Sequence, residues 1–212
     1  MYILGDIGNS ETKVVLVNSK NRIIKRINFQ TKKINNELLK SKFNSLIKNF
    51  TKIEKVLFCS VVPQSYKLIK NFILRNLKKK CYEVKELKLK SLINIKVNYK
   101  QVGSDRLTNA ISLLNNKDNF IILDFGTATT FDVVLKNRYK GGIIAPGVNL
   151  SLKTLIEKAQ LIPNTKLEKI KNIIGKTTQN AVRSGFYWGY QGLIENIINL
   201  IEKKNKKNIK II

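Results

Sequence analysis

Catalysis by this 212-residue chain has to rely on carboxylates, because the sequence contains no histidine. A Ser-His-Asp or Cys-His triad and a histidine-ligated metal site are therefore excluded. Only 14 Asp and Glu residues are present, so few side chains can serve as a general base or a metal ligand. The first candidates are carboxylates that lie beside glycines in turns at the ends of apolar segments, because turns of this kind can bind phosphate and a hydrated Mg²⁺.

Two turns of this kind occur in the two halves of the chain. Asp6-Ile7-Gly8-Asn9 and Asp124-Phe125-Gly126-Thr127 each end an apolar segment, and a second apolar segment with a Val-Val pair follows each of them. One such turn is explained as an ordinary hairpin turn, in which Asp, Gly and Asn are common. Two copies favour a phosphate-binding role, and they predict a duplicated lobe with a ligand-binding cleft between the copies.

A third candidate, Gly103-Ser104-Asp105-Arg106, precedes an apolar helical pattern. An acidic residue at that position is explained by the favourable helix dipole. Alternatively, Asp105 is a general base for a substrate hydroxyl and Arg106 binds a carboxylate or phosphate through two hydrogen bonds. Gly175-Lys176-Thr177 resembles the end of a Walker A loop, but the leading glycine is replaced by Ile170, so we do not predict a P-loop.

The apolar patterns predict an α/β protein in which strands and helices alternate over two cycles. The expected strands are residues 2–7, 12–18, 22–29, 56–62, 120–124, 130–135 and 139–144, with short strand segments at Val84 and residues 93–97. The expected helices are residues 35–49, 63–77, 104–114, 147–160 and 177–203. Gly185, Gly189 and Gly192 share one face of the last helix, which suits close packing or a subunit interface.

The net charge of +26 raises the possibility of a nucleic-acid-binding protein. The lysines are spread through the whole chain among Asn and Ile residues, so we interpret the charge as compositional background and nucleic acid as an unlikely partner. Apolar runs are too short to span a membrane, and no signal peptide is recognisable. Cys59 and Cys81 form no C-x-x-C pair, which predicts reduced thiols in a cytoplasmic protein.

Taken in order, these segments resemble type III pantothenate kinases. The resemblance runs from the N-terminus to about residue 201, and the matching segments read DIGNS from Asp6, GSDRL from Gly103, DFGTATTFD from Asp124, GGIIAPG from Gly141, GKTT from Gly175 and SG from Ser184. It implies an actin-like fold of two RNase H-like lobes with mixed sheets and a cleft between them, at residues 1–102 and 103–212, and a homodimer. The implied reaction is phosphorylation of pantothenate by MgATP to 4′-phosphopantothenate, the first step of coenzyme A synthesis.

The resemblance also implies roles for individual residues. Asp105 would accept the proton of the substrate hydroxyl, and Asp124 would bind the activating monovalent cation, K⁺ or NH₄⁺. The residues that would bind ATP are Asp6, Ile7, Gly8, Asn9, Ser10, Glu11, Thr12, Lys13 and Thr127. The residues that would contact pantothenate are Tyr99, Gly103, Ser104, Asp105, Arg106 and Thr178, the last of them across the dimer interface.

This sequence departs from the family pattern at two places. The loop before Gly103 is shortened and lacks proline, so Tyr99 lies closer to Gly103 than the substrate-contacting tyrosine of the family usually does. The sequence ends at Ile212, apparently within a strand that the family continues into a T-G-G turn and a final helix that help to hold the nucleotide. The alternative hypothesis is therefore an inactive relative, acting as a nucleic-acid-binding or regulatory protein.

Overall fold

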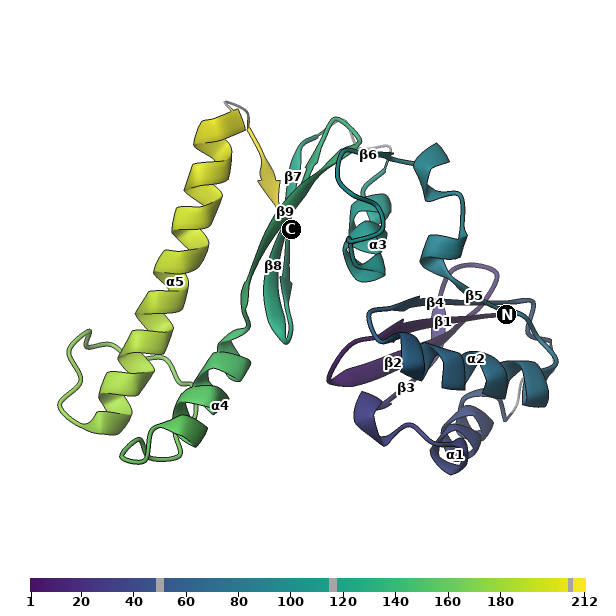
Figure 1. The fold of residues 1–212 in the computed structure, drawn as a ribbon, viewed down its shortest axis with the longest axis horizontal. Coiled ribbons are helices and arrows are strands. Elements are labelled where there is room, and N and C mark those ends of the chain that lie inside the picture. The colour runs from purple at the N-terminus through teal and green to yellow at the C-terminus, as the bar shows by residue number, and fades with distance from the viewer. Residues whose placement is uncertain (49–51, 115–117, 206–207) are drawn as a thin grey trace. The chain divides into compact units, whose positions relative to one another are not determined.

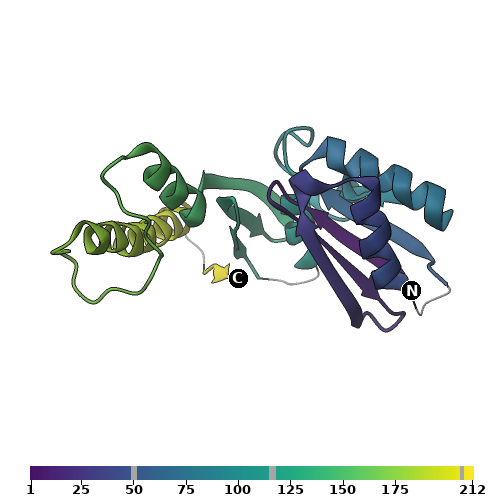
Figure 2. The same ribbon diagram turned by 90° about the horizontal axis from the view of Figure 1, so that it is seen from below.

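The computed structural model describes residues 1–48, 52–114, 118–205 and 208–212. The chain forms two compact units, Met1–Leu114 and Asn115–Ile212, and each is described by itself. Figures 1 and 2 show the elements of both units in two views. Asn49, the last residue of a predicted helix, lies outside the described residues.

The first unit is built on a mixed sheet with the strand order β3-β2-β1-β4-β5 (Figure 1). Its strands are β1 (Tyr2–Ile7), β2 (Glu11–Val17), β3 (Ile23–Gln30), β4 (Lys55–Ser60) and β5 (Cys81–Glu83). The first three strands form an antiparallel meander, while β4 and β5 extend the sheet in parallel with β1. Because β1 and β4 are parallel neighbours, Asp6 lies opposite Cys59 and Ile7 opposite Ser60.

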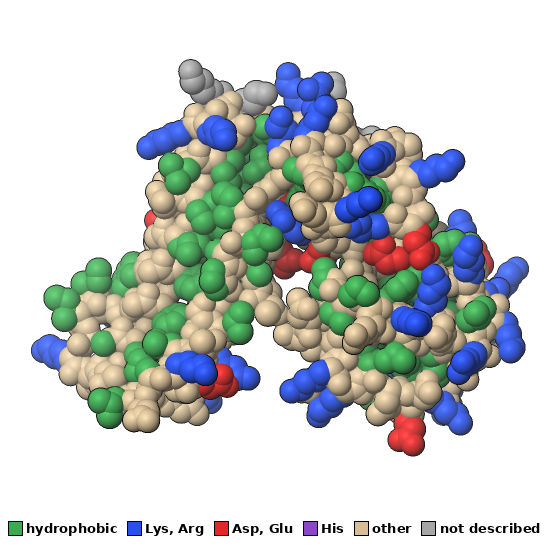
Figure 3. Space-filling view, in the orientation of Figure 1, with side chains coloured by type: hydrophobic (Ala, Val, Ile, Leu, Met, Phe, Trp, Pro, Cys, Tyr) green, Lys and Arg blue, Asp and Glu red, His purple; other side chains and the backbone are tan. Residues whose placement is uncertain are grey.

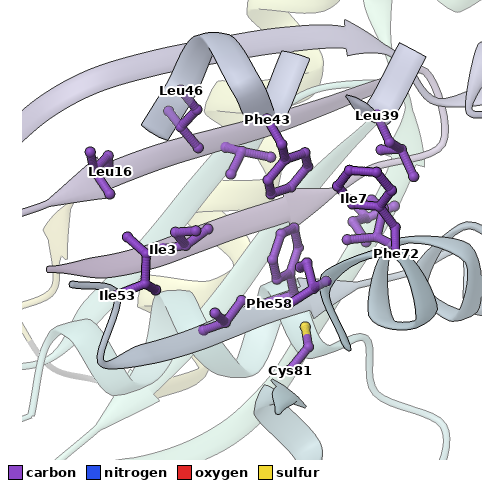
Figure 4. Packing of buried hydrophobic residues seen from close by; sticks show 14 of the residues in the cluster. Ile3, Ile7, Leu16, Leu39, Phe43, Leu46, Ile53, Phe58, Phe72 and Cys81 are labelled. Carbon is purple, nitrogen blue, oxygen red and sulfur yellow. The ribbon is translucent and has the colours of Figure 1, made fainter. Parts of the chain in front are cut away.

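Helices α1 (Asn36–Ile47) and α2 (Pro63–Leu77) cover the face of this sheet that carries Ile3 and Ile7. The Asn35 side chain accepts a hydrogen bond from the Leu38 N–H and so caps α1, and Pro63 occupies the first turn of α2. Figure 4 shows side chains of both helices packed over the strands. Gly5 is required by this packing, because a Cβ atom there would lie 2.0 Å from the Phe58 ring.

Short elements connect this sheet to helix α3 (Ser104–Ser112), whose Leu107 and Ala110 are buried. They are the 3-10 turns η2 (Val84–Glu86) and η3 (Leu89–Ser91) and the two-residue strand β6 (Asn94–Ile95), whereas the 3-10 turn η1 (Thr31–Lys33) lies between β3 and α1. The prediction of a strand at Val84 is wrong, since β5 ends at Glu83 and the Glu83 carboxylate caps η2 by accepting the Lys85 N–H. Within the predicted segment 93–97, only Asn94–Ile95 is a strand.

The second unit repeats this strand arrangement. Its strands β7 (Phe120–Phe125), β8 (Ala128–Leu135), β9 (Arg138–Pro146) and β10 (Lys210–Ile211) follow the order β10-β7-β8-β9, with β10 parallel to β7 and the others antiparallel. This matches β4-β1-β2-β3 of the first unit and confirms the predicted α/β class with mixed sheets. Helices α4 (Val148–Lys158) and α5 (Thr178–Asn205) lie side by side (Figure 2).

Among the described helices, none combines the length and apolar character that crossing a membrane requires. Helix α5 is the longest at 28 residues, yet only Ser184 and Ile201 within it are buried. Ile201 packs against Ile121 and Phe131 of the second sheet, so the C-terminal end of the helix is attached to that sheet. Leu193, Ile194, Ile197 and Ile198 are partly buried against the same cluster, while Gly185, Trp188, Gly189 and Gly192 are exposed.

Candidate active site

The turn between β1 and β2 carries the first predicted phosphate-binding segment. The Gly8 N–H donates to the Glu11 carbonyl at 3.1 Å and closes the turn. Thr31 supports the turn from below, because its hydroxyl donates to the Gly8 carbonyl at 2.7 Å and its N–H donates to the Ser10 carbonyl at 3.0 Å. The buried Thr12 and Thr31 hydroxyls also share a hydrogen bond of 2.9 Å. The turn thus has a fixed backbone, as a phosphate-binding loop requires.

Asp6 ends β1 with an exposed carboxylate that is oriented by a neighbouring thiol. The Cys59 Sγ–H donates to Asp6 Oδ1 at 3.2 Å from the adjacent position on β4. Burial raises the pKa of the Cys59 thiol strongly, and the negative charges of Asp6, Asp105 and Glu83 raise it further. The thiol therefore stays protonated and acts as a hydrogen-bond donor. Asp6 thus lies opposite Cys59, and Ser104, the residue before Asp105, is hydrogen-bonded to Ser60, the residue after Cys59.

Asp105 is positioned by the first turn of α3, which is attached to the end of β4. The buried Ser104 hydroxyl accepts the Ser60 N–H at 2.8 Å and donates to the Ser60 carbonyl at 2.9 Å. Asp105 Oδ1 accepts the Arg106 N–H at 2.8 Å. A Cβ atom on Gly103 would lie 2.3 Å from Asp105 Oδ1, so the glycine leaves the room that the half-buried carboxylate occupies.

The second unit has the equivalent turn after β7. Asp124 is exposed near the end of the strand, and the Gly126 N–H donates to the Ala128 carbonyl at 2.9 Å, as Gly8 does to Glu11 in the first unit. The start of α4 lies directly against this turn, because the Gly147 N–H donates to the Thr127 carbonyl at 3.0 Å. Thr127 itself is exposed. An exposed hydroxyl beside a helix N-terminus suits an anionic ligand.

Thr178 is exposed at the first position of α5. The preceding Gly175 packs closely on this helix, since a Cβ atom there would lie 2.2 Å from the Ala181 backbone nitrogen. The Thr177 hydroxyl accepts the Asn180 N–H at 3.2 Å and caps the helix. The GKTT segment therefore begins a helix through close packing and capping, and no strand leads into it as in a P-loop.

The sequence profile of type III pantothenate kinases matches residues 2–200 of this chain. The chain belongs to the type III pantothenate kinase family. A type III pantothenate kinase of Pelagibacter ubique is 60% identical over 212 residues, which cover 100% of this chain and 86% of the relative. Another, from a Sulfurihydrogenibium species, is 36% identical over 224 residues and the same shares of both chains. The protein is thus an ATP-dependent kinase of pantothenate, as the sequence motifs predicted.

Solved structures support the fold of this pantothenate kinase. A Campylobacter jejuni protein named as a member of the Baf family of transcriptional activators superposes with a TM-score of 0.58 at 19% identity, over 92% of this chain and 78% of that chain. A Sinorhizobium meliloti protein named as a 2-dehydro-3-deoxygalactonokinase gives a TM-score of 0.53 at 8% identity, over 100% and 93%. At these identities the similarity concerns the fold alone.

The structure brings some of the predicted residues of the kinase together and adds others that the sequence did not reveal. Within the first unit, Cys59 holds the Asp6 carboxylate, and Ser104 holds the start of α3, with Asp105, on the end of β4. Thr31 and Cys59 were not predicted, because no local motif marks a side chain whose partner lies 23 or 53 residues away. The Tyr99 hydroxyl donates to the Lys85 carbonyl at 3.0 Å, so its predicted contact with pantothenate stays a prediction.

We expect Thr31→Val to weaken the use of ATP by the kinase. Valine has a similar shape but leaves the Gly8 carbonyl and the Thr12 hydroxyl without the hydrogen bonds of Thr31. The variant should lose about 1–3 kcal/mol of stability, and KM for ATP should rise about tenfold because the turn is no longer fixed. Steady-state kinetics and urea unfolding measure both effects. Thr31→Ser retains the hydroxyl and should stay close to the parent protein, whereas equal losses in both variants would contradict the role of the hydroxyl.

Proposed function

We propose that Asp105 accepts the proton of the pantothenate hydroxyl while the γ-phosphoryl group of ATP is transferred to the oxygen. The observation that carries this assignment is the position of Asp105 at the start of α3, where the preceding Ser104 is hydrogen-bonded to Ser60, the residue after the Cys59 thiol that orients Asp6. A general base has to lie close to both the acceptor hydroxyl and the transferred phosphate. The arrangement of the first unit supports such a role.

The β1–β2 turn would supply backbone amides and Lys13 for the ATP phosphates. In the second unit, the family resemblance gives the exposed Thr127 hydroxyl a role in ATP binding. The described residues contain no cluster of three Cys, Asp or Glu side chains suited to holding a metal ion. Mg²⁺ that arrives with ATP keeps several waters and needs one or two carboxylates beside the phosphates. Asp6 is the carboxylate that would hold it. Bound Mg²⁺ would neutralise charge on the phosphates during transfer.

In the proposed step, the pantothenate oxygen forms a bond to the γ-phosphorus as the bond between that phosphorus and the bridging oxygen of ADP breaks. The hydroxyl proton moves to the Asp105 carboxylate, and the products are 4′-phosphopantothenate and ADP. Gly103, Ser104 and Arg106 line the pantothenate site, with Arg106 binding its carboxylate. Phosphoryl transfer depends mainly on positioning and electrostatics, so this set of residues suffices without histidine.

A coupled assay tests the proposal. The purified chain is incubated with pantothenate, MgATP and K⁺, and formation of 4′-phosphopantothenate is followed by mass spectrometry and ADP release. We expect stoichiometric formation of both products. No turnover at high ATP would favour the inactive relative, and ADP release without phosphorylated pantothenate would indicate ATP hydrolysis in place of transfer to pantothenate.

We further propose that Asp124 binds the activating monovalent cation. Its exposed carboxylate, beside the backbone carbonyls of the β7–β8 turn, offers the oxygen ligands that such ions take. Activity should therefore be high in K⁺ or NH₄⁺ and at least about tenfold lower in sodium-only buffer. Asp124→Asn should raise the K⁺ concentration that gives half-maximal activity. Equal rates in Na⁺ and K⁺ would contradict the assignment.

The proposed assembly is a homodimer formed through the second unit. Besides the poorly covered α5, the unit exposes an apolar groove of about 550 Å³. It is lined by Phe125, Val148, Leu167, Phe186, Tyr187, Tyr190 and Ile194, among others. Figure 3 shows apolar side chains exposed over α4 and α5, while Lys and Arg side chains are scattered over this face rather than gathered in one patch. Because the lysines are spread along the whole sequence, we do not propose nucleic acid as a partner, and the free Cys59 and Cys81 suit the cytoplasm.

Gly189→Arg should separate this dimer. Gly189 is exposed on α5, and apart from its chain neighbours and the adjacent backbone of its own helix no atom of the described residues lies within 4 Å of where its Cβ would be, so a long charged side chain leaves the monomer intact but obstructs helix contact. Light scattering should give twice the 24.3 kDa chain mass for the parent and 24.3 kDa for the variant. Gly189→Ala, which adds only a methyl group, is the matched control. A monomeric parent protein, or a Gly189→Arg variant that remains dimeric, would contradict the proposed interface.

A further inference from the structure

Lys85 lies in the η2 turn and contacts the segment that leads into α3. Its ammonium group donates to the Val102 carbonyl at 2.9 Å and to the Lys100 carbonyl at 3.3 Å. The same nitrogen lies 5.2 Å from the centre of the Tyr99 ring, within the range of a cation–π interaction. The half-buried Lys85 side chain thus contacts Tyr99, Lys100 and Val102 in the shortened loop before Gly103.

Tyr99 in turn forms a hydrogen bond with the backbone of Lys85. Its hydroxyl donates to the Lys85 carbonyl at 3.0 Å, while its half-buried ring lies beside the Lys85 ammonium group. Burial raises the pKa of the Tyr99 hydroxyl, and the Glu83 carboxylate raises it further, so the hydroxyl remains a donor at neutral pH. The two residues therefore hold each other through both main-chain and side-chain atoms.

Lys85 is itself held in place by its neighbours. The Glu83 carboxylate accepts the Lys85 N–H at 2.6 Å, and the Glu86 carboxylate accepts the Glu83 N–H at 3.4 Å. Glu86 also forms an ion pair with Lys70 of α2 at 3.0 Å. The η2 turn is thus attached to the helical layer of the first unit, and Lys85 projects from a fixed support.

These contacts fix the chain on one side of Gly103, and Ser104 fixes it on the other. The Val102 carbonyl is bound by Lys85, while the Ser104 hydroxyl makes two hydrogen bonds with the Ser60 backbone. Between them only Gly103 is left, in extended backbone geometry. Asp105 follows directly, so the direction in which its carboxylate points depends on both attachments.

We propose that Lys85 and Tyr99 are positioning residues for Asp105, and that the Tyr99 hydroxyl serves this pair rather than the substrate. The proposal rests on the role given to Asp105 above. In the shortened loop, the Tyr99 hydroxyl is hydrogen-bonded to the Lys85 carbonyl. This internal contact takes the place of the contact with pantothenate that the family resemblance implied.

Kinetics of four variants test the pair. Lys85→Met should lower kcat/KM for pantothenate about tenfold to hundredfold, because charged hydrogen bonds to the loop are lost. KM for ATP should change less than about twofold, since the β1–β2 turn is supported independently by Thr31. Tyr99→Phe should have a smaller effect in the same direction, and the double variant should be no worse than Lys85→Met alone. Lys85→Arg keeps the donors and should recover activity to within about threefold of the parent.

Hydrogen exchange supplies a readout that does not depend on catalysis. In Lys85→Met, backbone amides of residues 99–105 should exchange about tenfold faster, while those of α2 stay unchanged. Lys88→Met removes one positive charge from an exposed side chain of the same region and should alter neither exchange nor kinetics. This control separates the specific contacts from a general loss of charge.

Two outcomes would overturn the proposal. Unchanged exchange in Lys85→Met would show that the pair does not hold the loop, whether or not the enzyme turns over. A loss of kcat/KM in Tyr99→Phe, with Lys85→Met unaffected, would assign Tyr99 to direct substrate contact. If the parent protein lacks kinase activity, the proposed function fails, but the exchange measurement still decides whether Lys85 holds the segment.

Discussion

Asp105→Asn should abolish phosphoryl transfer while leaving the fold intact. Asparagine has nearly the same shape, and its Oδ1 can still accept the Arg106 N–H, so the start of α3 should keep its structure. It cannot take a proton from the pantothenate hydroxyl, and we expect kcat to fall about 10²–10⁴-fold. The coupled assay measures the loss, and thermal unfolding verifies that the variant is folded.

A matched control distinguishes a catalytic role of Asp105 from a favourable interaction of its charge with the helix dipole. Glu37 occupies the same position in α1 as Asp105 in α3, the second residue of the helix, and is exposed. Glu37→Gln should therefore lose only the interaction with the dipole, about 0.3–1 kcal/mol, and leave kcat unchanged. Near-normal turnover of Asp105→Asn would contradict the role as base and leave the dipole as the explanation for Asp105.

Gly147→Ala should damage both the stability of the second unit and the use of ATP. The added Cβ would lie 2.3 Å from the Gly126 carbonyl oxygen and 2.6 Å from the Thr127 carbonyl oxygen, so the backbone of the turn has to move. Overpacking of this kind costs about 1–3 kcal/mol. Because Thr127 is proposed to contact ATP, KM for ATP should rise at least about tenfold. The midpoint of urea unfolding and steady-state kinetics measure the two effects.

Gly126→Ala is the control for this variant. There the added Cβ would lie 3.7 Å from the Ala128 carbonyl oxygen, an ordinary van der Waals distance. Its loss of stability should therefore be clearly smaller than that of Gly147→Ala. If Gly147→Ala shifts neither the unfolding midpoint nor KM for ATP, close contact between α4 and the β7–β8 turn is not required.

The sequence by itself determined the class of fold, the duplicated strand pattern and the family. It predicted β1 and α2 to the residue, because strong local signals bound both elements. Apolar residues with a following glycine define β1, and Pro63 begins α2. Lys78 ends that helix in a left-handed conformation with φ of 53°. Val84 was misassigned because its apolar side chain is buried in a turn, a context that local periodicity does not distinguish from a short strand.

The tertiary structure alone decided how the candidate catalytic residues are held. Cys59 reaches Asp6, and Ser60 reaches Ser104, across 53 and 44 residues. The first contact follows from the parallel register of β1 and β4, which places Asp6 opposite Cys59, and the second follows from the packing of α3 on β4. A hydrogen bond of this kind requires a particular distance and direction between atoms of distant segments. No spacing along the chain encodes that geometry, because it arises only when the whole sheet and the helices packed on it have formed.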